Sequence, residues 1–334
     1  MNVLYTCDDN YIWVMGISII SLYQNNTEND DLNVFLLGDH ISDVNKNILK
    51  DIAGKYNRII SIIDIPMLDI PKELVSRRWP ISAFTRLFSA ELLPDRLDKI
   101  LYLDCDTIIN SDIKELESID MHHYIFYGVK DCIGSSYKKN IGLSNNALYV
   151  NAGVLLIDLN ELRKVNVYEV LSNYLKRYIA YINYADQDLL NGAFAGYIGI
   201  LDPKYDVMTI MSVYTYEEIK TLRKPTNYYE KKEIINAISE PVIIHYTTNM
   251  LTIRPWYNNS NHPYMDYFIR YYQMSPWSDK KLDDFIFKTK ESKIIRIIQM
   301  LPRRIANKLL GIIHSELNPK YIFLKAKIKL GKIY

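Results

Sequence analysis

Short apolar runs alternate with helix-like segments along roughly the first 260 residues of the chain. Runs typical of buried strands occur at residues 3–6, 33–37, 58–65, 99–103, 124–129, 149–157, 197–201 and 241–245. Apolar positions at helical spacing lie at residues 11–24, 42–56 and 81–92, and residues 186–194 resemble the start of another helix. Strands that alternate with helices in this way indicate a mainly parallel sheet flanked by helices. The expected fold class is therefore α/β.

The pattern changes beyond Trp277, where basic, isoleucine-rich helical stretches are interrupted by Pro302 and Pro319. Residues 279–334 contain 14 Lys and Arg against 5 Asp and Glu, although the whole chain has a net charge of only +1. The body is therefore mildly acidic and the tail strongly basic. We expect an α/β domain at residues 1–262 and a helical, basic, amphipathic region at residues 263–334.

Composition narrows the class of protein. Hydrophobic residues make up 49% of the chain and charged residues 24%, which is typical of a folded protein. The acidic body argues against general nucleic-acid binding, whereas the basic tail suits an anionic surface. Three cysteines without paired spacing predict a reducing compartment. No basic leader is visible and the uncharged stretch 11–23 is too short to span a bilayer, so we expect a cytoplasmic protein.

Asp104 and Asp106 directly follow the apolar run at residues 99–103. In an extended segment residues i and i+2 project to the same side, so the two carboxylates converge. They repel each other unless one is protonated or a cation lies between them. Oxygen ligands suit Mg²⁺ or Mn²⁺, and such an ion would neutralise a departing diphosphate. A turn with two solvated acids would leave the same short pattern.

The same stretch also fits a second enzyme class. Asp104-Cys105-Asp106-Thr107-Ile108 resembles the nucleophile motif of haloacid-dehalogenase-type phosphatases, in which Asp104 would be phosphorylated and Asp106 would act as acid and base. That class usually carries the motif in its first strand and needs a late Gly-Asp-like loop. Here the motif follows roughly the fourth expected strand and no such loop is evident. The phosphatase is therefore the weaker interpretation.

Four blocks in order resemble glycosyltransferase family 8, the bacterial glucosyl- and galactosyltransferases related to glycogenin. They are Tyr-Thr-Cys-Asp-Asp-Asn-Tyr at 5–11, Tyr-Leu-Asp-Cys-Asp at 102–106, Tyr-Val-Asn-Ala-Gly-Val-Leu-Leu at 149–156 and Tyr-Ala-Asp-Gln-Asp-Leu-Leu-Asn at 184–191. The resemblance covers residues 1 to about 260. It implies the GT-A fold, a Rossmann-like α/β domain, and retaining transfer of glucose or galactose from a UDP-sugar. The acceptor would be a saccharide or a lipid- or protein-linked glycan, in bacterial surface glycan synthesis.

The resemblance also implies roles for individual residues. It assigns Mn²⁺ or Mg²⁺ binding to Asp104, Asp106 and His245, and a place near the anomeric carbon to Gln187 or Asp188. It assigns donor and nucleotide binding to Thr6, Asp8, Asn10, Tyr11, Arg86, Asp104, Cys105, Asp106, Asp131, Asn151, Asp186, Gln187 and Arg254.

Each of these assignments competes with a structural interpretation. Asp8 is also a suitable helix cap, Arg86 a solvent-facing helical arginine, and His245 a buried structural histidine. Residues 186–188 could be a negatively charged first helical turn. The loop at 246–256 departs from the family pattern, because a Gly is missing and Arg254 stands where Lys is expected; Arg can still clamp a phosphate.

Retention of configuration requires either a double displacement or attack on the same face. Gln187 is a poor nucleophile, so we expect same-face attack, with Asp188 as the alternative nucleophile. The basic tail fits an anionic inner-membrane leaflet and packing on protein about equally. Two further alternatives remain open at this point: a catalytically silent nucleotide-sugar-binding protein, and a self-glucosylating enzyme that modifies one of the 28 tyrosines.

Overall fold

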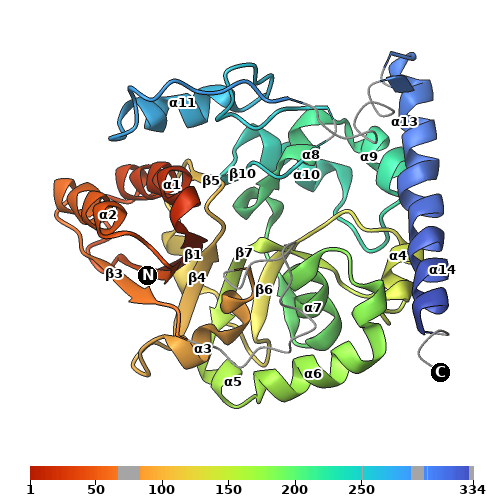
Figure 1. Ribbon diagram of the computed structural model, residues 1–334, viewed down its shortest axis with the longest axis horizontal. Helices are drawn as coiled ribbons and strands as arrows, with labels where there is room; N and C mark the ends of the chain where they lie inside the picture. The colour runs from red at the N-terminus through yellow and green to blue at the C-terminus, as the bar shows by residue number, and fades with distance from the viewer. Residues whose placement is uncertain (67–82, 250, 287–296, 299, 331–334) are drawn as a thin grey trace.

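The computed structural model describes residues 1–66, 83–249, 251–286, 297–298 and 300–330. A seven-stranded sheet with the order β3-β2-β1-β4-β7-β6-β8 forms its centre (Figure 1). Its strands are β1 (Asn2–Asp8), β2 (Asn33–Asp39), β3 (Ile60–Asp64), β4 (Lys99–Leu103), β6 (Phe126–Lys130), β7 (Val150–Asp158) and β8 (Ile198–Ile200). Only β7 runs against its neighbours in this sheet, so the α/β class with a mainly parallel sheet is confirmed.

Alternating residues of each strand bury two separate cores. Val3 and Tyr5 of β1 face one core, and Leu4 faces the other, because successive side chains of a strand point to opposite faces. The first core is covered by α1 (Ile12–Asn25), α2 (Asp43–Lys55), α10 (Lys231–Ser239) and α11 (Met265–Gln273). The second is covered by α3 (Ser89–Leu92), α5 (Leu159–Arg163), α6 (Val167–Tyr178) and α7 (Ala185–Ala193). Helices on both faces explain why the central strands are apolar throughout.

A second, three-stranded sheet lies beyond the carboxyl end of β4. It has the order β5-β10-β9, formed by β5 (Thr107–Ile109), β10 (Ile243–His245) and β9 (Val207–Met208). The chain leaves β4, passes through residues 104–106 and pairs antiparallel with β10, so that Thr107 lies opposite His245. This pairing carries a residue distant in the sequence to the end of β4.

The strands expected from the sequence are all present, with small shifts at their ends, and Ser42 caps α2 by accepting from the Asn45 amide at 3.3 Å. The helix expected at 81–92 is different. Residues 81–82 lie outside the described part, and the remainder forms the 3-10 turn η3 (Thr85–Phe88) followed by the single turn α3. No distinct pattern in the sequence predicted the short strands β5 and β9 or the helices α4 (Ser135–Asn140), α8 (Thr209–Val213) and α9 (Tyr216–Arg223).

The tail is helical but less interrupted than expected. After Pro302, α13 (Arg303–Ile312) continues through a π-helical turn, η7 (Ile313–Leu317), into α14 (Asn318–Leu330). Pro319 does not break this segment, because it lies in the first turn of α14, directly after the π-helical turn, where a missing N–H is tolerated. Figure 1 shows the segment running along α9 and α4.

One face of the tail packs on the body. Ala306, Leu310 and Gly311 are buried against α9, and the Asn140 side chain donates to the Pro319 carbonyl at 2.8 Å. The division at residue 262 stays a prediction, although α11 beyond it packs in the first core. Among the described helices, none combines the length and apolar character needed to cross a bilayer.

Candidate active site

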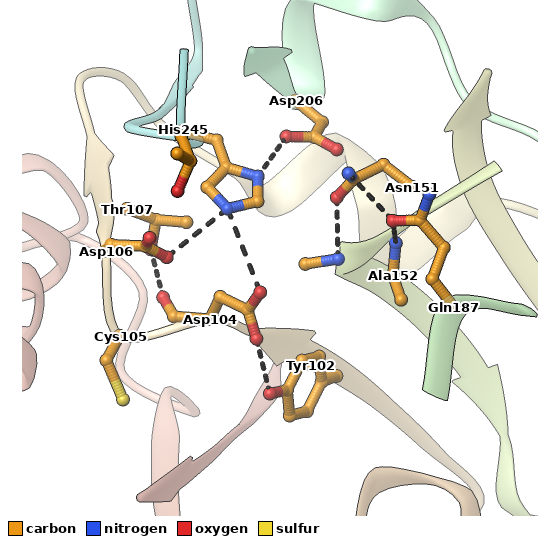
Figure 2. A network of polar contacts seen from close by, with 12 residues as sticks. Tyr102, Asp104, Cys105, Asp106, Thr107, Asn151, Ala152, Gln187, Asp206 and His245 are labelled. Atoms are coloured by element: carbon orange, nitrogen blue, oxygen red, sulfur yellow. Dashed lines mark hydrogen bonds and ion pairs between the residues drawn. The ribbon is translucent and has the colours of Figure 1, made fainter. Parts of the chain in front are cut away.

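Asp104, Asp106 and His245 meet at the end of β4. Each offers one ligand atom, and these three atoms lie within 4.8 Å of one another. The His245 Nε2 atom is 3.3 Å from Asp106 Oδ1 and 3.8 Å from Asp104 Oδ2 (Figure 2). Cys105 points away from the imidazole, as expected for the middle residue of an extended triplet. Two carboxylates and an imidazole form a donor set suited to a divalent cation.

The second oxygen of each carboxylate is held by the protein. The Tyr102 hydroxyl donates to Asp104 Oδ1 at 2.6 Å, and the Arg86 guanidinium lies 2.9 Å from the same oxygen. Asp106 Oδ2 is 3.1 Å from the Arg254 guanidinium. Although burial opposes its ionisation, Arg254 and His245 lower the pKa of Asp106 to about 2. Asp104 Oδ2 and Asp106 Oδ1 therefore remain directed toward the imidazole.

The imidazole of His245 is oriented in the same way. Its Nδ1 atom lies 2.9 Å from Asp206 Oδ1, so Nε2 is the nitrogen that faces Asp104 and Asp106. Burial lowers the pKa of His245, but the carboxylates of Asp206 and Asp106 outweigh burial and raise it well above its usual value. No sequence pattern pointed to Asp206, which precedes a two-residue strand and has no spacing relation to His245.

Gly153 allows the ligands to approach one another. A Cβ atom at this position would lie 2.2 Å from His245 Cε1 and 2.8 Å from Asp104 Oδ2. The Asp104 amide also donates to the Gly153 carbonyl at 2.7 Å. The glycine in the third sequence block is therefore required by side chains from two other strands, rather than by its own backbone conformation.

Two adjoining cavities of about 300 Å³ each share the walls formed by Arg86, Asp104, Asp106 and Arg254. The first cavity is also lined by Thr6, Cys7, Asp8, Tyr11, Ala83 and Cys105. The second is also lined by Asn151, Ala152, Gly153, Tyr184, Ala185, Asp186, Gln187, His245, Thr247 and Thr248. Asp104 and Asp106 thus line both cavities, and His245 joins them from the second.

The residues of the first sequence block lie mostly in the first cavity. Asp8 caps the following helical turn by accepting from the amides of Asn10 and Tyr11 at 3.0 and 3.3 Å, and it also lines the cavity. Cap and ligand contact are therefore compatible. Asn10 is exposed and does not line either cavity. The Tyr11 hydroxyl accepts from Arg254 at 3.2 Å, which connects the two ends of the domain.

Arg86 is buried, so the solvent-facing interpretation is wrong. Besides Asp104, its guanidinium contacts the Ala152 carbonyl at 2.5 Å and Asp186 at 3.2 Å. Burial raises the pKa of Asp186 to about 6, and Arg86 opposes this effect. Arg86 thus joins the carboxylate of Asp104 to the start of α7.

Gln187 is fixed at the floor of the second cavity. Its Nε2 donates to Asp131 Oδ2 at 2.9 Å, and its Oε1 accepts from Asn151 Nδ2 at 3.1 Å and from the Ala152 amide at 3.3 Å (Figure 2). The structure therefore brings Gln187, Asn151 and Asp186 to the cavity. Asp131 lies behind Gln187 and is absent from the lining.

Asp188 does not reach either cavity. Its carboxylate is fully buried and accepts from the hydroxyls of Tyr137 and Tyr149 at 2.5 and 2.7 Å, and from the amides of Asn183 and Tyr184 at 2.8 and 2.7 Å. These four bonds hold the loop in which Ala185 has a left-handed φ of 45°. The contacts of Asp188 are those of a residue that shapes the site.

The sheet order, and the Asp-x-Asp pair with a histidine beside a two-part cavity, fit the GT-A glycosyltransferase expected from the four sequence blocks. The chain belongs to glycosyl transferase family 8, whose family model matches residues 2–260. It is 32% identical to a lipopolysaccharide 1,2-glucosyltransferase of Escherichia coli, over 83% of this chain and 79% of that protein. It is 25% identical to a lipopolysaccharide 1,3-galactosyltransferase of Salmonella typhimurium, with the same coverage.

Solved structures agree on the fold. The galactosyltransferase LgtC, in complex with donor and acceptor sugar analogs, superposes with a TM-score of 0.68 at 22% identity, covering 84% of this chain and all of that one. The glycosyltransferase GlyE of Streptococcus pneumoniae superposes with a TM-score of 0.58 at 20% identity, covering 86% and 65%. The family expected from the four blocks is confirmed, and the phosphatase interpretation is wrong.

Proposed function

We propose that this chain transfers glucose or galactose from a UDP-sugar to a glycan acceptor in bacterial surface glycan synthesis. The relatives that act on lipopolysaccharide support this choice of sugar and acceptor class. The observation that carries the proposal is the convergence of the ligand atoms of Asp104, Asp106 and His245 at the second cavity, while the two aspartates also line the first. The first cavity would take the nucleoside and the second the hexose, with the diphosphate between them.

Different residues of the chain would bind the cation, the phosphates and the hexose. Asp104, Asp106 and His245 would hold a divalent cation, Mn²⁺ or Mg²⁺, which neutralises charge on the departing diphosphate when bound. Arg254 is positioned to clamp a phosphate once it is released from Asp106. Asp186 and Gln187 would bind the hexose hydroxyls from the floor of the second cavity.

Metal-dependent hydrolysis of donors tests the function. UDP-glucose, UDP-galactose and their N-acetyl forms are incubated with the protein and Mn²⁺, with and without chelator. We expect one of the UDP-hexoses to be hydrolysed, with loss of activity in chelator. Donor binding without turnover in the presence of acceptor would identify a silent binding protein and contradict the proposal. An intact-mass increase in the protein itself would identify self-glucosylation.

Retention is proposed to occur by attack on the face from which the diphosphate leaves, with a diphosphate oxygen taking the acceptor proton. Asp188 is unsuited to be a nucleophile, because both its oxygens are occupied and burial raises its pKa. We therefore expect no covalent hexose on Asp188 when the wild-type protein is quenched with donor and analysed by peptide mass spectrometry. A glycosylated peptide that contains Asp188 would contradict same-face attack.

The tail presents an apolar and basic face, here called the tail face, on the side away from the body. Its exposed apolar members recur near helical spacing: Ile305, Leu309, Ile312, Ile313, Leu317, Tyr321, Leu324 and Ile328. Exposed basic side chains flank them at Arg304, Lys308, Lys320, Lys325 and Lys327. The apolar side chains suit the hydrocarbon region of a membrane, and the basic side chains suit anionic lipid headgroups. We propose that it attaches the enzyme peripherally to the inner membrane.

Charge placed on the tail face should release the protein from lipid. The double variant Leu317→Asp/Leu324→Asp changes two side chains that are 53% and 59% exposed. Flotation with phosphatidylglycerol vesicles is expected to fall at least about tenfold, because burying one leucine contributes about 1.5–3 kcal/mol. Ile59→Asp changes an apolar side chain on the body that is 82% exposed, and it should float like the wild type. Equal flotation of the double variant and the wild type would contradict membrane attachment.

A further inference from the structure

A buried carboxylate lies behind His245, outside both cavities. Asp206 follows the 3-10 turn η6 (Pro203–Tyr205) and directly precedes β9, and its side chain is fully buried. Its Oδ1 atom is 2.9 Å from His245 Nδ1. Its Oδ2 atom has no hydrogen-bond partner among the described residues. In the part of the chain that the structure describes, the His245 imidazole is therefore the one side chain that forms a hydrogen bond with the Asp206 carboxylate.

Such an arrangement is costly for stability. A buried carboxylate loses its hydration, and several hydrogen-bond donors around it can compensate for that loss. One hydrogen bond, with the second oxygen left without a donor, compensates for only part of the desolvation free energy. Asp188 in the same domain shows the alternative, since four donors surround it. The environment of Asp206 thus differs from that of a carboxylate that serves the fold.

The backbone holds Asp206 in a fixed position relative to the imidazole. β9 pairs in parallel with β10, with Val207 opposite Ile244 and Met208 opposite His245. The preceding Tyr205 is anchored by its hydroxyl, which donates to Glu115 at 2.7 Å. Regular pairing on one side and an anchored turn on the other leave the carboxylate little freedom to move.

We propose that Asp206 is a positioning residue for cation binding, which accepts a hydrogen bond from Nδ1 of His245 and so directs Nε2 toward Asp104 and Asp106, where a bound cation would take the place of the Nε2 proton. The inference rests on the proposed metal site. A neutral imidazole carries one proton, and the hydrogen bond at one nitrogen decides which nitrogen is free to bind a metal. Without the carboxylate, the ring is free to rotate and to carry its proton on Nε2, where it blocks the cation.

Mn²⁺ affinity tests this role independently of turnover. Free Mn²⁺ is titrated by electron paramagnetic resonance against wild type, Asp206→Asn and Asp206→Ala. We expect Asp206→Ala to bind Mn²⁺ about 10–100-fold more weakly, the usual loss when the partner of a metal-ligating histidine is removed. Asp206→Asn should lose less, because its amide oxygen can still accept from Nδ1. The matched control is Asp158→Asn, which alters a half-buried carboxylate that caps α5 by accepting from the Glu161 amide at 2.9 Å. It should bind Mn²⁺ within about twofold of wild type, because Asn also caps a helix and Asp158 contacts no metal ligand.

The outcomes separate the inference from the function on which it rests. Equal Mn²⁺ affinity in wild type and Asp206→Ala would overturn the positioning role and leave the metal site intact. No Mn²⁺ binding by wild type would overturn both. If the variants fail to fold, ¹⁵N NMR of the Mg²⁺-saturated wild type tests the positioning role by locating the proton on the His245 ring. We expect the proton on Nδ1, and a proton on Nε2 would contradict the proposal.

Discussion

Asp106→Ala is expected to lower the rate of hexose transfer at least about 1,000-fold, because the loss of a metal ligand removes several kcal/mol of charge stabilisation from the leaving diphosphate. The substitution deletes the Oδ1 atom that faces His245 Nε2 at 3.3 Å. It also removes the carboxylate that pairs with the Arg254 guanidinium, so that this ion pair is lost. The measurement is turnover of the preferred UDP-hexose at saturating donor and Mn²⁺.

The control for Asp106→Ala is Asp95→Ala, which removes a fully exposed carboxylate that lines neither cavity. It should retain wild-type turnover, with an unchanged melting temperature. Asp106→Ala should melt somewhat below the wild type in chelator, because Arg254 and His245 lower the pKa of Asp106 and its ionised carboxylate therefore stabilises the folded state. Turnover by Asp106→Ala within about tenfold of wild type would show that the Asp-x-Asp pair does not hold the reacting diphosphate.

Gly153→Ala is expected to cost about 100-fold or more in metal-dependent turnover, the size of effect that a misplaced catalytic group produces. The added methyl would occupy space 2.2 Å from His245 Cε1 and 2.8 Å from Asp104 Oδ2, so at least one ligand must move. Because the displaced atoms are metal ligands, the apparent Mn²⁺ affinity should fall along with the rate. Titration of turnover against Mn²⁺ measures both.

Gly54→Ala provides a matched control for the added methyl. A Cβ atom at Gly54 in α2 would meet nothing within 4 Å. This variant should keep full activity and gain up to about 1 kcal/mol of stability, because alanine favours the helix. Wild-type Mn²⁺ affinity in Gly153→Ala would mean that His245 and Asp104 do not need their close approach.

The strand pattern was largely predictable because the central strands are buried on both faces and so appear as continuous apolar runs. The Asp-x-Asp pair was predictable for a similar reason, since it depends only on local extended geometry. The place of His245 was not derivable from spacing. It depends on the antiparallel pairing of β5 with β10, which joins segments far apart in the chain, and only the family resemblance indicated it.

Other features could not be predicted because tertiary contacts decide them. Arg86 lies in a 3-10 turn and is buried by Asp104, Asp186 and the Ala152 carbonyl, none of which is near it in the sequence. Asp188 has a sequence position that suits the cavity, yet Tyr137 and Tyr149 hold it outside. Asp206 left no signal at all, since its partner is identified only by the pairing of β9 with β10.

The tail packs on the body through one face, and its binding to lipid through another face stays a proposal. Sequence patterning could not separate packing on protein from binding to lipid, because a helix can do both with different faces. Ala306 and Leu310 pack on the body, and the tail face points away from it. The small residue Gly311 allows close packing, since a Cβ atom there would lie 2.5 Å from the Thr221 carbonyl oxygen.

The most direct test of the account is a crystal structure of the protein with UDP and Mn²⁺, using anomalous scattering at the manganese edge. We expect a single anomalous peak among Asp104 Oδ2, Asp106 Oδ1 and His245 Nε2, in contact with the diphosphate. UDP bound in the cavities with no manganese between these three side chains would contradict it.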